Sequence, residues 1–279
     1  MIASYGQGIV LNIFFGTVIN ASQGIANQVK GQLGAFATTM MKALNPVIAK
    51  SEGAGDRDLM IRASIMGSKI SFFLLMIFYV PVLIEMPYIF KVWLKNVPEF
   101  AVLFCQLLLI RTLIEQLFLT LNTSISAVGN IRNFQIFSSI LWSLPLIISY
   151  VLFKFGLPPY FLYLAFLIYS ILAGILVLYF SRKNFDLKIS HFLKDVVLKC
   201  SLSFIITFAI STLPIWFLKT GLIRLILVLI ISTISFTVTA WFIGFSSNER
   251  IKIKQIVIPF IKKIVQKKAA PMIETVQNN

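Results

Sequence analysis

The chain has 279 residues, of which 58% are hydrophobic and only 13% are charged, and its mean hydropathy is +0.89. A soluble core of this size cannot bury so many apolar side chains, so the composition excludes an ordinary soluble domain. The net charge of +15 does not indicate nucleic-acid binding, because the basic residues lie in short runs between long apolar stretches. The sequence therefore predicts an integral membrane protein.

Continuous apolar runs, rather than residues alternating with a period of two, favour membrane helices over a β-barrel. A helix that crosses the hydrocarbon core, about 30 Å thick, needs roughly 20 residues. We expect an all-α integral membrane bundle of about eight transmembrane helices, at 2–21, 25–49, 63–85, 100–122, 134–154, 160–180, 196–218 and 222–245.

The distribution of Lys and Arg between the loops predicts the orientation. Most cations outside the spans fall in the loops at 50–62, 130–133 and 181–199 and in the tail 246–279, whereas the loop at 91–98 carries fewer. The positive-inside rule therefore places both termini in the cytoplasm, since eight is an even number of spans. The basic tail suits either a helix on the inner membrane surface or a solvated segment that sets the topology.

The first two predicted spans carry polar residues at helical spacing. The polar positions are Asn12, Gly16, Asn20, Gln23 and Asn27 in the first stripe and Gln28, Gln32, Ala35, Thr39, Lys42 and Asn45 in the second. A membrane helix turns such a stripe toward protein or water, so these residues are candidates for the lining of a hydrated cavity. The alternative is dry interhelical packing, which Gly31 and Gly34 would allow by close approach.

Two charged residues, Arg111 and Glu115, lie four positions apart near the middle of the fourth predicted span. An unpaired Arg in a membrane helix costs about 2.5–3.5 kcal/mol, so we expect the two side chains to pair. The pair has either a structural role or a transport role, in which Arg111 meets an anionic cargo or Glu115 exchanges a coupling proton or sodium ion. Lys69 and Lys154 lie near span ends and are expected to extend to the membrane surface.

No phosphate-binding GxxxxGK[ST] loop, HExxH pair or GxSxG elbow occurs in the sequence. Cys105 and Cys200 each lie in an apolar run, and His191 lies in a polar loop without neighbouring ligand-type residues. We expect no enzyme activity, no cofactor and no metal site.

Four stretches resemble the C-terminal part of polysaccharide (O-antigen) flippases of the multidrug/oligosaccharidyl-lipid/polysaccharide exporter superfamily. They are GIVLNIFFGTVINASQGIANQV, NPVIAKSEGAGDRD, FKVWLKNVPEF and ISAVGNIRNFQI, within a resemblance that covers about residues 8–180. It implies the second six-helix lobe of a MATE-like transporter at 1–180 with a truncated first helix, two additional transmembrane helices at 181–245 and a basic cytoplasmic tail at 246–279. The first lobe would be missing from this chain.

The function implied by the resemblance is the flipping of an undecaprenyl-diphosphate-linked oligosaccharide across the bacterial inner membrane, for polysaccharide or lipopolysaccharide biosynthesis. The partners would be this lipid-linked sugar, membrane lipids and an N-terminal lobe. The alternatives are a MATE-type drug or cation antiporter, with Glu115 or Glu85 as coupling acid, and a membrane assembly subunit that transports nothing. The candidate substrate-binding residues are Asn12, Asn20, Gln28, Gln32, Lys42 and Arg111.

Overall fold

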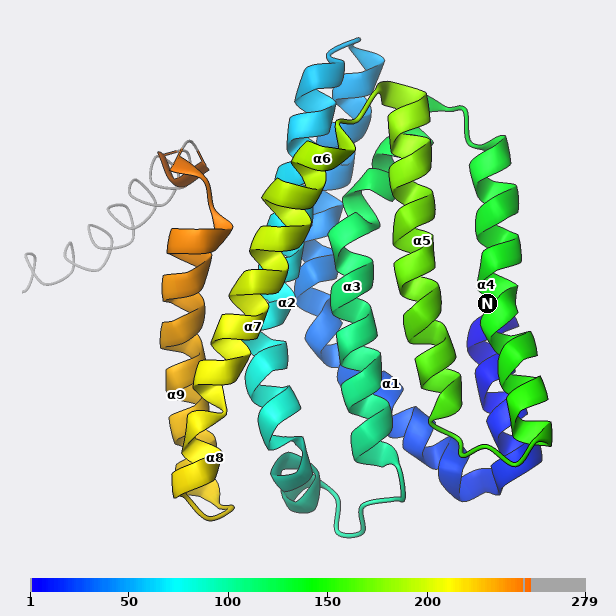
Figure 1. Ribbon diagram of the computed structural model, residues 1–279, viewed down its shortest axis with the longest axis vertical. Coiled ribbons are helices and arrows are strands. Elements are labelled where there is room, and N and C mark those ends of the chain that lie inside the picture. The colour runs from blue at the N-terminus through cyan, green and yellow to red at the C-terminus, as the bar shows by residue number, and fades with distance from the viewer. Residues whose placement is uncertain (1, 248, 252–279) are drawn as a thin grey trace, which may run out of the picture.

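The computed structural model describes residues 2–247 and 249–251, and this part of the chain folds into helices without a β-strand (Figure 1). The helices are α1 (Ile2–Gly53), α2 (Arg57–Trp93), α3 (Ala101–Val128), α4 (Arg132–Lys154), α5 (Phe161–Phe185), α6 (Ile189–Phe192), the π-helical turn η1 (Leu193–Leu198), α7 (Lys199–Ser211), α8 (Leu213–Phe217), α9 (Leu222–Thr239) and the π-helical turn η2 (Ala240–Gly244). The basic tail predicted at 246–279 lies, from residue 252 onward, outside the described residues.

Seven helices or helix runs in the described residues are long and apolar enough to cross a membrane, one fewer than the number of about eight that we expected. The two spans expected at 2–21 and 25–49 both lie in α1, which consists of two helical parts that meet at a kink at Gly16. The break between them therefore lies at Gly16 and not at the expected residues 22–24, where the helix is continuous. An odd number of spans also removes the parity argument that placed both termini on one side.

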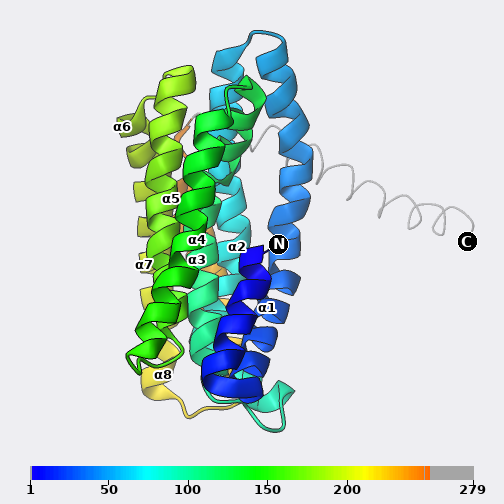
Figure 2. The same cartoon turned by 90° about the vertical axis from the view of Figure 1, so that its right-hand side faces the viewer.

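The kink in α1 lies at Gly16, whose φ of 79° and ψ of −173° are accessible to glycine and strained for other residues. The segment before Gly16 folds back beside the long rising part of α1 (Figure 2). Gln23 Nε2 donates a hydrogen bond to Gln7 Oε1 at 3.3 Å across the kink. A Cβ atom on Gly8 would lie 3.2 Å from Asn20 Oδ1, so a glycine there permits the close approach.

The long helices run up and down the bundle, so its loops gather at two ends (Figure 1). The α1–α2, α3–α4 and α5–α6 connections lie at one end, and the α2–α3, α4–α5 and α8–α9 connections lie at the other. The first end therefore carries the loops rich in Lys and Arg. Seven helices of membrane-spanning length indicate a multi-pass membrane protein.

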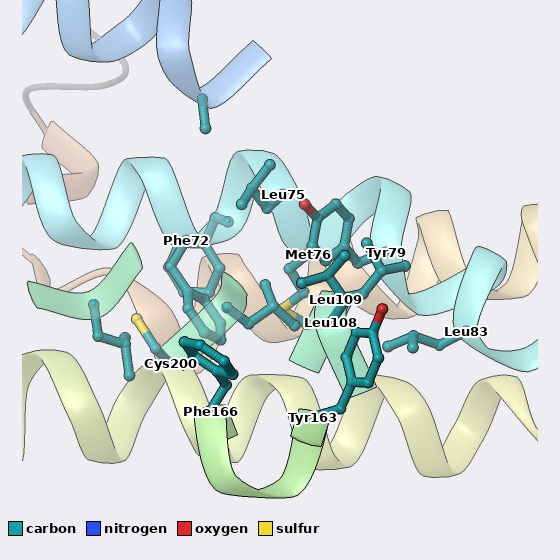
Figure 3. Close-up of a cluster of buried hydrophobic side chains, with 14 of the residues drawn as sticks. Phe72, Leu75, Met76, Tyr79, Leu83, Leu108, Leu109, Tyr163, Phe166 and Cys200 are labelled. Atoms are coloured by element: carbon teal, nitrogen blue, oxygen red, sulfur yellow. The ribbon is translucent and has the colours of Figure 1, made fainter. Parts of the chain in front are cut away.

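The core of the bundle lies around α2 and α3, which pack against each other and against α1, with α5 packed on α3 and α7 packed on α2. Figure 3 shows part of this apolar cluster, whose labelled members are Phe72, Leu75, Met76, Tyr79, Leu83, Leu108, Leu109, Tyr163, Phe166 and Cys200. Hydroxyl pairs join α2 to α3, with Ser64 and Ser68 hydrogen-bonded to Ser124 and Thr120 at 2.5 Å. Small polar residues thus hold the two most buried helices together, as is common in membrane bundles.

Candidate functional site

The polar stripe predicted on α1 lies on an exposed face of the helix. Gln28, Gln32, Thr39 and Lys42 are all exposed, as is Asn12 in the segment before the kink. The neighbouring apolar positions Val29, Leu33, Met40 and Leu44 are only partly exposed, and Val29 and Leu33 pack against the core. The bundle therefore uses the apolar side of α1 for packing and leaves the amide side uncovered.

Asn12 and Asn20, two of the predicted substrate-binding residues, come together in a hollow of about 600 Å³ inside the kink of α1. Its lining residues are Gly8, Ile9, Asn12, Asn20, Gln23, Gly24 and Asn27. The kink at Gly16 explains this meeting, because it brings residues eight positions apart onto facing parts of the same helix.

A second hollow, which we call the α1–α3 groove, has a volume of about 410 Å³. Its lining residues are Asn27, Lys30, Gly31, Gly34, Ala37, Thr38 and Met41 of α1, Leu75 of α2, and Thr112, Glu115, Gln116 and Leu119 of α3. Asn27 lines both hollows, so polar groups continue along α1 from one to the other.

The glycines on α1 keep the α1–α3 groove open. A Cβ atom added at Gly31 or Gly34 would meet no described atom within 4 Å, apart from its own helix backbone. The alternative in which these glycines allow tight helix packing is therefore not seen in the described residues. Gly67 on α2 provides a close contact instead, since a Cβ atom there would lie 2.7 Å from Thr120 Cγ2 on α3.

Arg111 and Glu115 form the predicted ion pair, with Arg111 Nε donating to Glu115 Oε1 at 2.7 Å. The guanidinium carbon of Arg111 lies 4.6 Å from the centre of the Phe166 ring, a cation–π contact that directs this side chain toward α5. Arg111 is buried and does not line the α1–α3 groove, whereas the Glu115 side chain is 34% exposed and does. Arg111 therefore offsets the negative charge of Glu115 from a buried position that is not part of the groove lining.

Two residues of the α1–α3 groove, Lys30 and Gln116, were not among the predicted site residues. Lys30 is half-buried and interacts electrostatically with both Glu115 and Arg111. Gln116 is only 6% exposed, and its side-chain nitrogen has no hydrogen-bond partner in the described residues. A lysine in mid-span is itself a signal of function and could have drawn attention to Lys30. Lys42, by contrast, is exposed and lines neither hollow.

Lys69 does not extend to the membrane surface, as was expected, but is completely buried. Its Nζ donates to Asp195 Oδ2 at 2.8 Å and to both carboxylate oxygens of Glu249 at 2.9 Å, and Lys199 also pairs with Asp195. The expectation failed because η1, just before α7, and the segment after η2 cover this face of α2 and supply the carboxylates of Asp195 and Glu249 there. The cluster ties the last two spans to α2.

Glu85 is also completely buried, at the other end of α2 from Lys69. Arg224 Nε and Nη2 donate to its two carboxylate oxygens at 2.7 Å and 2.9 Å. A bidentate pair of this kind satisfies the Glu85 carboxylate within the protein. Glu85 therefore serves as an anchor for α9, and its carboxylate faces neither hollow.

Comparisons of the chain with protein-family models, with curated proteins and with solved structures find no match. The function is therefore inferred from the residues and their arrangement.

Proposed function

We propose that this chain forms part of the transport path of a flippase that moves undecaprenyl-diphosphate-linked oligosaccharide across the bacterial inner membrane. The observation that supports this proposal is the exposed polar side of α1 that carries Gln28, Gln32, Thr39 and Lys42, which we call the amide face after its two glutamines. Hydrocarbon cannot hydrogen-bond these groups, so in a membrane this face borders water, a polar ligand or another protein. A hydrated path along this face of α1, within the membrane, accommodates the sugars of a lipid-linked cargo.

The charges along α1 favour an anionic cargo over a cationic one. Lys30 and Lys42 are cations without a bonded carboxylate in the described residues, whereas Glu115 is bonded to Arg111 and Glu85 to Arg224. Positive charge without a bonded partner attracts the diphosphate of a lipid-linked sugar and opposes a cationic drug. In the proposed protein, the helices described here form the second lobe of a MATE-like transporter with two additional helices, and the loops rich in Lys and Arg face the cytoplasm.

A second candidate function is a drug or cation antiporter of the same superfamily. The observation that favours it is the partial exposure of Glu115 in the α1–α3 groove, where a carboxylate can exchange a proton or bind a cation. Its pairing with Arg111 lowers the attraction for a second cation. A membrane assembly subunit is the third candidate, in which a partner protein covers the amide face.

Binding to the full chain in lipid nanodiscs tests the flippase. We expect saturable binding of a fluorescent undecaprenyl-diphosphate-linked oligosaccharide, and tighter binding of it than of ethidium, a cationic dye. Ethidium binding that is lost in Glu115→Gln would support the antiporter instead. Absence of binding by both probes would overturn both transport functions and favour the assembly subunit.

Cysteine accessibility tests the supporting observation directly. Cysteines at Gln32 and Thr39 are expected to react with a water-soluble thiol reagent in the membrane-embedded protein, and cysteines at Leu33 and Met40 are expected to be protected. Equal protection at all four positions would show that the amide face is dry and would remove the basis of the proposal.

A further inference from the structure

The α1–α3 groove contains two hydrogen-bond donors that lack an acceptor in the described part of the chain. Gln116 Nε2 is buried without a partner, and Lys30 makes no hydrogen bond or ion pair. Buried polar groups in native proteins are nearly always satisfied, and an orphaned donor weakens folding. The orphaned amide of Gln116 and the half-buried cation of Lys30 line the same groove, and together they indicate that a ligand supplies the acceptors.

The charges around the groove determine the sign of that ligand. Arg111 and Glu115 bond to each other at 2.7 Å and contribute opposite charges, which act on Lys30 in opposite directions. Of the three charged groups Lys30, Arg111 and Glu115, only Lys30 has no bonded opposite charge in the described residues, so the three together carry a net positive charge. A half-buried cation beside an amide N–H is a site for an anion with several acceptor oxygens.

The shape of the groove allows such an anion to enter. Gly31 and Gly34 follow Lys30 along α1 and leave open space where side chains would otherwise project. Leu75 and Leu119 form apolar parts of the same lining. A groove with a cationic polar side and an apolar side fits an amphipathic ligand, in which an anionic group is attached to a hydrocarbon chain.

We propose that the α1–α3 groove is a phosphate-binding site, in which Lys30 of α1 and Gln116 of α3 donate to the oxygens of a phosphate or diphosphate group. Asn27 lies in the same lining and provides a further amide donor. The site deepens the proposed function and rests on it for the identity of the ligand, the diphosphate of a lipid-linked substrate. Binding joins α1 to α3, because the two donors come from different helices.

Two substitutions and a control test the site on the full chain in nanodiscs, with inorganic pyrophosphate and farnesyl diphosphate as probes. Lys30→Gln removes the charge, and Gln116→Leu replaces the amide by an apolar side chain of similar size. We expect each to weaken the binding of both probes about tenfold or more. Lys50→Gln removes the same charge from an exposed position at the end of α1 and is expected to leave affinity unchanged.

The thermal stability of the ligand-free protein separates a binding role of Gln116 from a structural one. Because Gln116→Leu removes an unsatisfied buried amide, we expect the melting temperature without ligand to rise by about 2–4 °C while affinity falls. A lower melting temperature with unchanged affinity would show that the amide supports packing, and would overturn the site. Wild-type affinity in both variants would overturn it as well.

The two probes separate the sources of the phosphate group. Tighter binding of farnesyl diphosphate than of pyrophosphate supports a lipid-linked ligand, and equal binding supports a site for free phosphate. Pyrophosphate binding that depends on Lys30 and Gln116, together with no binding of the lipid-linked oligosaccharide, would keep this site and refute the flippase. Oligosaccharide binding that is unchanged in both variants would refute this site and keep the flippase.

Discussion

The ion pair between Glu85 and Arg224 predicts an unequal response to the loss of either partner. Glu85 is 0% exposed, whereas the side chain of Arg224 is 12% exposed and belongs to the first turn of α9. Arg224→Gln leaves a carboxylate that cannot reach water, and we expect it to destabilise the protein by about 3–5 kcal/mol, the cost of breaking a buried pair. Glu85→Gln leaves a long cation that can extend toward the nearby helix end, so we expect a smaller loss.

The double substitution Glu85→Gln with Arg224→Gln removes both charges and restores electrical neutrality. We expect its loss of stability to be smaller than the sum of the two single losses, by more than about 1 kcal/mol. The measurement is the free energy of unfolding in mixed micelles as SDS is added, followed by circular dichroism. Additive losses, or a larger loss for Glu85→Gln than for Arg224→Gln, would refute the reasoning from burial.

The pair between Arg57 and Glu52 is a matched control for this experiment. It also has two hydrogen bonds between guanidinium and carboxylate, at 2.6 Å and 3.3 Å, but its Arg side chain is 47% exposed. Exposed pairs contribute little to stability, since water solvates each charge after the partner is lost. Arg57→Gln is therefore expected to change the stability much less than Arg224→Gln.

Two further predictions concern packing and orientation. Gly174→Leu is expected to destabilise the bundle by about 1–3 kcal/mol in the same unfolding assay, because a Cβ atom there already lies 2.5 Å from Phe118 Cε2; unchanged stability would show that α5 does not pack closely on α3. With the loops rich in Lys and Arg in the cytoplasm, a membrane-impermeant thiol reagent added outside cells is expected to label Asn96→Cys and spare Asn184→Cys. The reverse pattern would place those loops outside.

Several features of this protein follow from the sequence alone, because they depend on short stretches of chain. The membrane class and the helical class follow from apolar runs of about 20 residues, which are solvated by lipid whatever the fold. The pairing of Arg111 with Glu115 was predicted correctly, since residues four apart on a helix are neighbours in any fold. The exposed amide face of α1 likewise follows its helical period.

Other features were decided by the tertiary structure, because they join residues that are far apart in the chain. Lys69 lies 126 residues from Asp195, and Glu85 lies 139 residues from Arg224, so no local pattern could assign their partners. The position of the kink also escaped prediction, since a glycine permits a positive φ without requiring it.

The candidate site shows the same division. Amides and cations on α1 could be recognised as unsuited to lipid, but their spacing did not show which of them meet a second helix. Lys30 lines the groove opposite α3 and Lys42 lies outside it, although both are cations on the same helix. The orphaned amide of Gln116 is visible only in three dimensions, because a side chain lacks a partner only with respect to everything packed around it.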